Sequence, residues 1–206
     1  MQKAIFLSLG FVLLLFTSNG QEIDHQRLNA YFDTLEAHKK LMGSVAILQN
    51  GKVSYTKAIG YTDVASSEKS NVNTKYRIGS ISKTFTAVLT LMAVEEKKIK
   101  LNQTIHKFFP SIENAKKISV LNLLNHRSGI KNFTSDPNYT SWLTESKSED
   151  QLVQIITDLG SEFKPGSEAR YSNSNYVLLT YILQRIYNIS YEKLLDQKIA
   201  QPLGLK

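Results

Sequence analysis

Ser80 and Lys83 have the side-chain types and the spacing of a nucleophile and its proton acceptor. Residues three apart on a helix share one face, so a helix that begins near Ser80 would bring the lysine amine beside the hydroxyl. A serine hydroxyl becomes a good nucleophile when a base takes its proton, and a lysine can be that base when burial or nearby cations keep its amine neutral. The pair therefore indicates covalent catalysis. The alternative is a helix-capping serine followed by a solvated lysine.

The residues around Ser80 favour the catalytic interpretation. A strand-like run at 75–78 and Gly79 precede it, and the apolar stretch 85–94 follows it. Apolar residues on every side of that stretch predict a buried helix. The N–H groups at the start of such a helix stabilise negative charge, and a central helix holds a nucleophile in place. Ser82 is a second candidate for the residue that caps this helix.

The composition of the 206-residue chain argues against several kinds of site. No cysteine is present, which excludes a thiol nucleophile and a cysteine zinc site. The net charge of +7 occurs without a basic stripe and interleaved aromatic residues, so we expect no nucleic-acid partner. The histidines lack the spacing of metal ligands, and we expect no metal ion or other cofactor. They are His25, His38, His106 and His126, of which we interpret His126 as structural.

The N-terminus has the composition of a secretory signal peptide. A basic start at 1–3 is followed by the apolar run 4–16 and by small polar residues. The run is short for a membrane span. We therefore predict a signal peptide over 1–20, cleavage near Gly20, and a secreted or periplasmic protein with no stable membrane insertion after cleavage. The remainder, 21–206, suits one domain. The alternative is an uncleaved anchor.

Hydrophobic periodicity predicts the main elements of the domain. Residues 28–35 have the spacing of an amphipathic helix, which Gly43 would end. Two strands, 44–48 and 53–58, flank Asn50-Gly51, a strong signal for a tight hairpin turn. The polar segment 62–73 is typical of a loop, and the long polar excursion 131–150 could rim a site. Further helices are predicted near 152–159, 176–187 and 191–199.

Four segments occur in an order that is characteristic of one superfamily. They are Gly79-Ser80-Ile81-Ser82-Lys83-Thr84-Phe85, then Leu123-Leu124-Asn125-His126-Arg127-Ser128-Gly129, then Pro165-Gly166 with Tyr171-Ser172-Asn173, and finally Pro202-Leu203-Gly204-Leu205. Together they resemble the serine β-lactamase and penicillin-binding protein superfamily, specifically its class C-like branch. The resemblance implies an α+β, β-lactamase/transpeptidase-like fold with a helical subdomain and an N-terminal hairpin of an antiparallel sheet.

The resemblance also implies roles for individual residues. Ser80 would be the acylated nucleophile and Lys83 its proton partner. Tyr171 would be a second acid or base, held so that a cation favours its phenolate, and Asn173 would donate its amide to the substrate. Without the resemblance, Tyr171 would be a half-buried aromatic residue and Asn173 a helix cap. Class A β-lactamases have Ser-Asp-Asn in place of the tyrosine motif, whereas Ser135-Asp136 is followed here by proline.

The third motif of the superfamily, Lys or His followed by Thr or Ser and Gly, has no candidate after the tyrosine motif. In the superfamily this motif lies on a strand near the C-terminus and supplies an oxyanion donor. We therefore expect the chain to be truncated, with the C-terminal strands of the sheet missing and with weak or absent acylation of its own, since one oxyanion donor can contribute about a hundredfold in rate.

The resulting expectation is an exported serine hydrolase that forms an acyl-serine intermediate. Its substrate would be a β-lactam, a D-Ala-D-Ala-type peptide or a small ester. The alternatives are a penicillin-binding or cell-wall-peptide-binding protein that does not turn over, or an inactive fragment of the hydrolase. An inert secreted interaction domain is a further alternative, but it leaves the pairing of Ser80 with Lys83 unexplained. The sequence does not determine the substrate among these classes or the oligomeric state.

Overall fold

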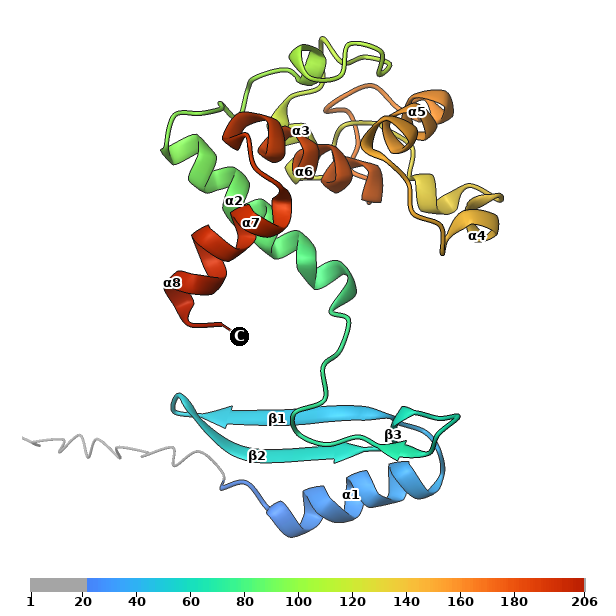
Figure 1. The fold of residues 1–206 in the computed structure, drawn as a ribbon, viewed down its shortest axis with the longest axis vertical. Coiled ribbons are helices and arrows are strands. Elements are labelled where there is room, and N and C mark those ends of the chain that lie inside the picture. The colour runs from blue at the N-terminus through green and yellow to red at the C-terminus, as the bar shows by residue number, and fades with distance from the viewer. Residues whose placement is uncertain (1–21, 206) are drawn as a thin grey trace, which may run out of the picture. The chain divides into compact units, whose positions relative to one another are not determined.

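A computed structural model describes residues 22–205, which form two compact units (Figure 1). One unit ends at Arg77 and the other begins at Ile78, so the predicted nucleophile belongs to the second unit. The predicted signal peptide lies outside the described residues, and the predicted domain boundaries stay a prediction. Within residues 22–205, no helix combines the length and the apolar composition that a membrane span requires.

The N-terminal unit, over residues 22–77, combines one helix with two small antiparallel sheets. The elements are α1 His25–Ala37, β1 Gly43–Gln49, β2 Lys52–Ile59, β3 Tyr61–Asp63 and β4 Glu68–Lys69. β1 pairs with β2, and β3 pairs with β4. α1 lies along one face of the β1–β2 hairpin (Figure 1), where Phe32, Tyr55 and Ile59 form a small buried core.

The predicted first helix is confirmed, but it ends earlier than predicted. Asp24 caps its start, because the Asp24 carboxylate accepts a hydrogen bond of 2.9 Å from the Arg27 N–H. Its end is set by Lys39, whose φ of 53° takes the chain out of the helix before Gly43 is reached. The Lys40 N–H then donates back to the Leu35 carbonyl at 2.8 Å, which satisfies a carbonyl of the last turn.

The predicted hairpin is confirmed, including its turn. Asn50 and Gly51 have φ values of 52° and 74°, as a type I′ turn requires. The prediction of a loop over 62–73 is wrong in part, because β3 and β4 pair within it. These strands are only three and two residues long, too short for the alternating pattern that identifies a strand.

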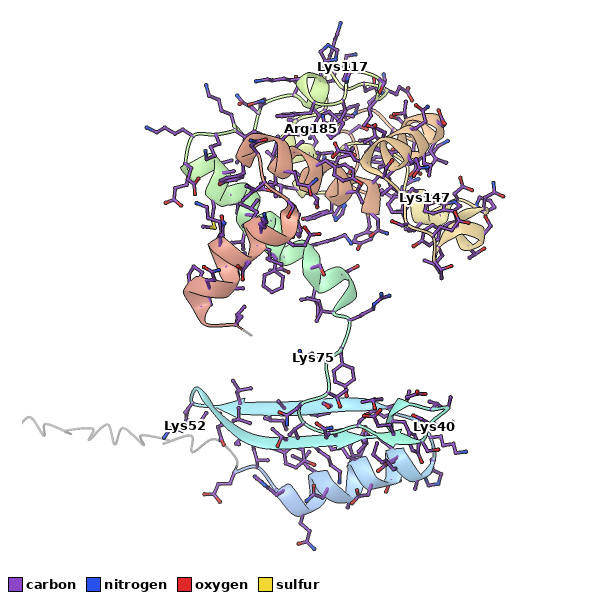
Figure 2. All side chains as sticks on the ribbon, viewed as in Figure 1. Lys40, Lys52, Lys75, Lys117, Lys147 and Arg185 are labelled. Atoms are coloured by element: carbon purple, nitrogen blue, oxygen red, sulfur yellow. The ribbon has the colours of Figure 1, made fainter. Side chains whose placement is uncertain are left out.

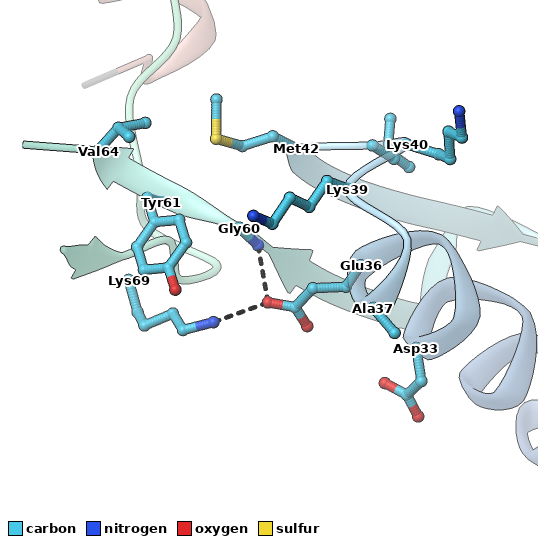
Figure 3. A pocket seen from close by; sticks show the side chains of 11 residues that line it. Asp33, Glu36, Ala37, Lys39, Lys40, Met42, Gly60, Tyr61, Val64 and Lys69 are labelled. Atoms are coloured by element: carbon cyan, nitrogen blue, oxygen red, sulfur yellow. Dashed lines mark hydrogen bonds and ion pairs between the residues drawn. The ribbon is translucent and has the colours of Figure 1, made fainter.

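A cavity of about 670 Å³ opens beside α1 in the N-terminal unit. Figure 3 shows Glu36 at its centre, with one carboxylate oxygen accepting from the Gly60 N–H at 3.1 Å and from the Lys69 amine at 2.9 Å. The Lys69 amine also lies 4.5 Å from the centroid of the Tyr61 ring. These contacts hold the β3–β4 hairpin against the end of α1.

The C-terminal unit, over residues 78–205, is helical. The elements are η1 Gly79–Ile81, α2 Ser82–Glu95, η2 Ile105–Lys107, α3 Val120–Leu124, η3 Phe133–Ser135, α4 Tyr139–Trp142, α5 Glu149–Leu159, α6 Asn173–Tyr187, α7 Tyr191–Leu195, η4 Asp196–Ala200 and α8 Gln201–Leu203. The predicted helices at 152–159, 176–187 and 191–199 are confirmed, although the last is divided by the π-helical segment η4.

α6 is the centre of this unit. Leu178, Leu179, Ile182 and Leu183 are at most 1% exposed, and α6 contacts both α2 and α3. Because α6 begins at Asn173, the burial of its apolar face fixes the position of the residues at its start. The same packing fixes α2, which carries Leu89 and Ala93 into the core.

Two predictions about the surroundings of Ser80 are wrong. α2 is not buried on every side in the described residues, because Val88 and Leu91 are 42% and 51% exposed. Its buried face consists of Thr86, Leu89, Thr90 and Ala93, which is one stripe of the helix. The run 75–78 forms no strand, since no other strand pairs with it within residues 22–205.

The basic charge of the chain is spread over many elements. Figure 2 shows labelled lysines that project from separate parts of both units, among them Lys52, Lys117 and Lys147. Several other basic side chains form ion pairs, such as Arg185 with Glu149 at 2.6 Å. In the described part of the chain, the labelled basic side chains are therefore dispersed and do not form one stripe.

Candidate active site

Ser80 lies in the short turn η1, immediately before α2. Gly79 precedes it with a φ of 53°, a conformation that other residues rarely adopt. The structure corrects the expectation of a serine cap: the N-cap position of α2 is Ile81, no side chain caps the helix, and Ser82 is its first residue. Ser80 is therefore held by backbone geometry, and its hydroxyl is left to contact other side chains.

Lys83 and Tyr171 both contact the Ser80 hydroxyl. The Lys83 amine donates to Ser80 Oγ at 3.1 Å, as their spacing on one helix predicts. Ser80 Oγ is also hydrogen-bonded to the Tyr171 hydroxyl at 2.9 Å, although 91 residues separate them in the chain. The Lys83 amine lies 4.9 Å from the centroid of the Tyr171 ring. The structure thus brings the three predicted catalytic residues together.

Asn173, the first residue of α6, completes the group. Its side-chain oxygen accepts from the Lys83 amine at 2.7 Å. Its side-chain nitrogen donates to Asn132 Oδ1 at 3.2 Å and to Thr134 Oγ1 at 2.9 Å. Both ends of the amide are therefore occupied by groups of the chain itself. The predicted donation of this amide to a substrate stays a prediction, and the contact seen here is with Lys83.

Asn132 and Thr134 belong to the site, although no sequence pattern identifies them. Asn132 Oδ1 accepts from the backbone N–H of Asn173 at 3.0 Å as well as from its side chain. The predicted role of the excursion 131–150 as a rim is in keeping with this contact, but nothing in the spacing singled out these two residues. Their partner, Asn173, lies about 40 residues further along the chain, so only the fold brings the three residues together.

A buried hydrogen-bond network fixes the loop that carries Asn132. Ser128 Oγ donates to Asn175 Oδ1 at 2.6 Å and accepts from the Ile130 N–H at 3.0 Å. Ser174 Oγ donates to the Lys131 carbonyl at 2.6 Å and accepts from the Phe133 N–H at 3.2 Å. Because these serines and Asn175 are buried, breaking the network would leave polar groups without partners. The loop is therefore rigidly attached to the start of α6.

The electrostatic surroundings of Tyr171 favour its ionisation. Partial burial alone would raise the pKa of the Tyr171 phenol, but hydrogen bonding with Lys83 and Ser80 and the charge of Lys83 lower it more. The net effect is a pKa below the ordinary phenol value of 10.0. The side chain is 49% exposed, so a substrate can approach it. A tyrosine of this kind can serve as a general base.

His126 packs directly against Tyr171. The centroids of the two rings are 4.6 Å apart, and the centroid of the Tyr176 ring lies 5.2 Å from that of the same imidazole. Burial, together with the charge of Lys83, lowers the pKa of His126 below the ordinary value of 6.5. From the sequence, His126 is interpreted as structural, and the structure places it against the site.

A cavity of about 480 Å³ adjoins the catalytic group. Its lining includes Tyr171 and Asn132 and carries side chains of both charges, among them Lys131, Asp136 and Arg170. Arg170 is ion-paired with Glu162 and, at 3.4 Å, with Glu168. Within residues 22–205, no three His, Cys, Asp or Glu side chains are grouped in a way that could hold a metal ion.

Comparison with known proteins gives matches over most of the chain. The beta-lactamase family matches residues 28–206. The teichoic acid D-alanine hydrolase of Staphylococcus aureus is 30% identical over 188 residues, which cover 91% of this chain and 45% of the hydrolase. The chain thus spans less than half the length of this curated relative.

Solved structures share the fold over a similar extent. The crystal structure of FmtA from Staphylococcus aureus matches 87% of this chain and 48% of its own, with a TM-score of 0.74 at 30% identity. The D-amino acid amidase from Ochrobactrum anthropi SV3, complexed with L-phenylalanine amide, matches 88% of this chain and 52% of its own, with a TM-score of 0.73 at 29% identity. The octameric penicillin-binding protein homologue from Pyrococcus abyssi matches 88% of this chain and 43% of its own, with a TM-score of 0.77 at 30% identity. The predicted α+β, β-lactamase/transpeptidase-like fold is confirmed.

Replacing Asn132 tests whether this side chain holds the start of α6. Asn132→Ala removes the acceptor for the backbone and side-chain N–H groups of Asn173, which are partly buried. We expect a loss of about 1–3 kcal/mol in the free energy of unfolding, measured by urea denaturation. Asn138→Ala is the matched control, because Asn138 is exposed and caps no helix through its side chain. Equal stability of the two variants would contradict this role.

Proposed function

The chain belongs to the beta-lactamase family, and on that premise we propose that it is a serine hydrolase that forms an acyl-enzyme on Ser80. The observation that carries this proposal is that the Ser80 hydroxyl contacts both a hydrogen-bond donor and a candidate base. Lys83 donates a hydrogen bond to Ser80 Oγ, and Tyr171 lies within 2.9 Å of the same oxygen. A nucleophile, a cation and a base of lowered pKa thereby meet at one atom.

In the proposed acylation step, the Tyr171 phenolate is the base. Because the Lys83 amine donates to Ser80 Oγ, the proton of the serine itself is directed toward the Tyr171 oxygen. Tyr171 takes that proton as Ser80 Oγ forms a bond to the substrate carbonyl carbon. The bond from that carbon to the leaving oxygen or nitrogen then breaks, and Tyr171 returns the proton to the leaving atom. The acyl group remains on Ser80.

Deacylation uses the same groups with water as the nucleophile. Water transfers a proton to Tyr171 while its oxygen attacks the acyl carbon. The bond to Ser80 Oγ breaks, and Ser80 recovers its proton from Tyr171. Lys83 remains a cation beside Tyr171 throughout, and the Asn173 side-chain oxygen holds its amine in place at 2.7 Å. The role of Asn173 in this proposal is to position Lys83.

The proposed substrate class is an ester or amide of a D-amino acid. The curated relative is named for hydrolysis of D-alanine from teichoic acid, and a solved relative is named as a D-amino acid amidase. The cavity beside Tyr171 carries Asp136 and Lys131, so it offers groups of both charges to a polar substrate. β-Lactams, D-Ala-D-Ala-type peptides and simple esters are the other classes that the same acylation chemistry would accept.

A fluorophosphonate probe tests the proposed nucleophile. We expect at most a slowly formed adduct on Ser80, because no third motif follows the tyrosine motif in this chain. Peptide mass mapping should locate the adduct, and it should be absent in Ser80→Ala. Tyr171→Phe should slow labelling by roughly 10²–10⁴, the usual contribution of one general base. The labelling rate of the unmodified chain should rise with pH, because the deprotonated Tyr171 phenol is the active form. The midpoint of this rise should lie below pH 10.0, since the pKa of Tyr171 is lowered from that value. Labelling of another serine, or labelling that persists in Ser80→Ala, would contradict the assignment.

We also propose that the protein acts outside the cytoplasm, on the basis of the basic start, apolar run and small residues within 1–20. After expression of the whole chain in a bacterial host, N-terminal sequencing should find a mature protein that begins within a few residues of Gly20. A product that keeps Met1 and stays in the cytoplasmic fraction would contradict export. This measurement does not depend on catalytic activity.

A further inference from the structure

The backbone of His126 holds the segment that leads into α6. His126 has a φ of 58°, in the left-handed region that residues other than glycine and asparagine rarely occupy. In this conformation its carbonyl accepts a hydrogen bond of 2.9 Å from the Arg170 N–H, one residue before Tyr171. An uncommon backbone conformation is thus retained at a residue that contacts the catalytic segment.

The imidazole ring holds the same segment from the other side of Tyr171. His126 Nδ1 accepts from the Ser172 N–H at 3.2 Å and lies 3.3 Å from the side-chain nitrogen of Asn175. Both neighbours are N–H donors, so Nδ1 must carry a lone pair and the ring must be neutral. The backbone and ring of one residue therefore bind positions 170 and 172, on either side of Tyr171.

The ring also fills the space between two tyrosines. The centroid of the imidazole lies 4.6 Å from that of the Tyr171 ring, with 35° between the ring planes. It lies 5.2 Å from the centroid of the Tyr176 ring, with 38° between the planes. Tyr176 is itself fixed, because its hydroxyl donates to the Leu124 carbonyl at 3.0 Å. Tyr171 thus rests on a ring that α3 and α6 hold in place.

From these contacts we propose that His126 is the positioning residue of Tyr171: its neutral ring holds the phenol against Ser80 and Lys83, and protonation of the ring releases it. In the described part of the chain, the titratable and charged groups that face His126 are Lys83 from α2, Tyr171 from the preceding segment and Tyr176 from α6. No carboxylate is among them, so a charged imidazole has no carboxylate partner there.

Protonation of His126 would act on the site in two ways. An N–H at Nδ1 would oppose the two donors that now face it, so the hydrogen bond to Ser172 would be lost. The new charge would also repel Lys83, which already lowers the pKa of this histidine. The neutral form stabilises the fold fully above pH 6.5, and that stability is lost as the pH falls from 6.5 toward the lower pKa of the folded state.

The first test follows the unmodified chain and uses a substitution only to assign resonances. Imidazole carbon resonances give the pKa of His126, assigned by their absence in His126→Asn, and fluorophosphonate labelling of Ser80 is followed over the same pH range. We expect a pKa below 6.5 and a labelling rate that falls as the pH drops through that same value. A rate that is constant through the titration of His126 would overturn the proposal. This readout rests on the proposed function, because it measures the reactivity of Ser80.

The second test does not require Ser80 to react. His126→Asn suits it because asparagine tolerates a positive φ and its side-chain oxygen can accept from the Ser172 N–H, while the ring is lost. Titration of the Tyr171 Cζ resonance should show a phenol pKa below 10.0 in the unmodified chain and a value closer to 10.0 in His126→Asn. The labelling rate should fall by up to about 10²-fold, the scale expected for a misplaced catalytic group.

His106→Asn is the matched control, because His106 is also half-buried in the same unit but makes no contact with Tyr171 in the described structure. It should leave the Tyr171 pKa and the labelling profile unchanged. An unaltered Tyr171 pKa in His126→Asn would overturn the proposal. If no probe labels Ser80 in any variant, the proposed function fails, whereas a Tyr171 pKa that rises only in His126→Asn would still support the positioning role.

Discussion

The hydrogen bond from Lys83 to Asn173 joins the first turns of α2 and α6, 90 residues apart in the chain. The remaining contacts of the site depend on these two turns staying together. Ser80 lies in η1 immediately before α2, Lys83 lies in the first turn of α2, and Tyr171 directly precedes α6. Their mutual position is set by the buried apolar face of α6, since Leu178, Leu179, Ile182 and Leu183 pack in the core. Burial of about four such side chains contributes several kcal/mol, more than the polar contacts of the site could supply alone.

The loop 126–134 explains how these turns keep one orientation. Ser128 and Ser174 use their hydroxyls to bind the loop to α6, and Asn132 then accepts from both N–H groups of Asn173. These bonds leave the Asn173 carbonyl oxygen facing Lys83. A buried polar network stabilises the fold only if every member has a hydrogen-bond partner, because an unpaired buried polar group lowers the free energy of unfolding. The same loop begins at His126, so the orientation of Asn173 and that of Tyr171 depend on one segment.

The sequence was sufficient to predict the features that rest on local rules. The spacing of Ser80 and Lys83 predicted their contact, Asn50-Gly51 predicted the hairpin turn, and apolar periodicity predicted α1, α5 and α6. The meeting of Ser80 with Tyr171 required the resemblance to a superfamily, because no local rule relates residues 91 positions apart. Asn132 and Thr134 were missed for the same reason. The exposed face of α2 was missed because composition shows that a helix is apolar, but not which side its neighbours cover.

Trapping an acyl group on the chain tests the central claim most directly, namely that Ser80 is a nucleophile activated by Lys83 and Tyr171. The chain is incubated with an activated ester of D-alanine, quenched in acid and analysed by intact mass and peptide mapping. The account predicts a D-alanyl group on Ser80, less of it with the L-alanine ester, and none in Lys83→Ala or Ser80→Ala. A D-alanyl group attached to another residue, or an equal amount in Ser80→Ala, would contradict it.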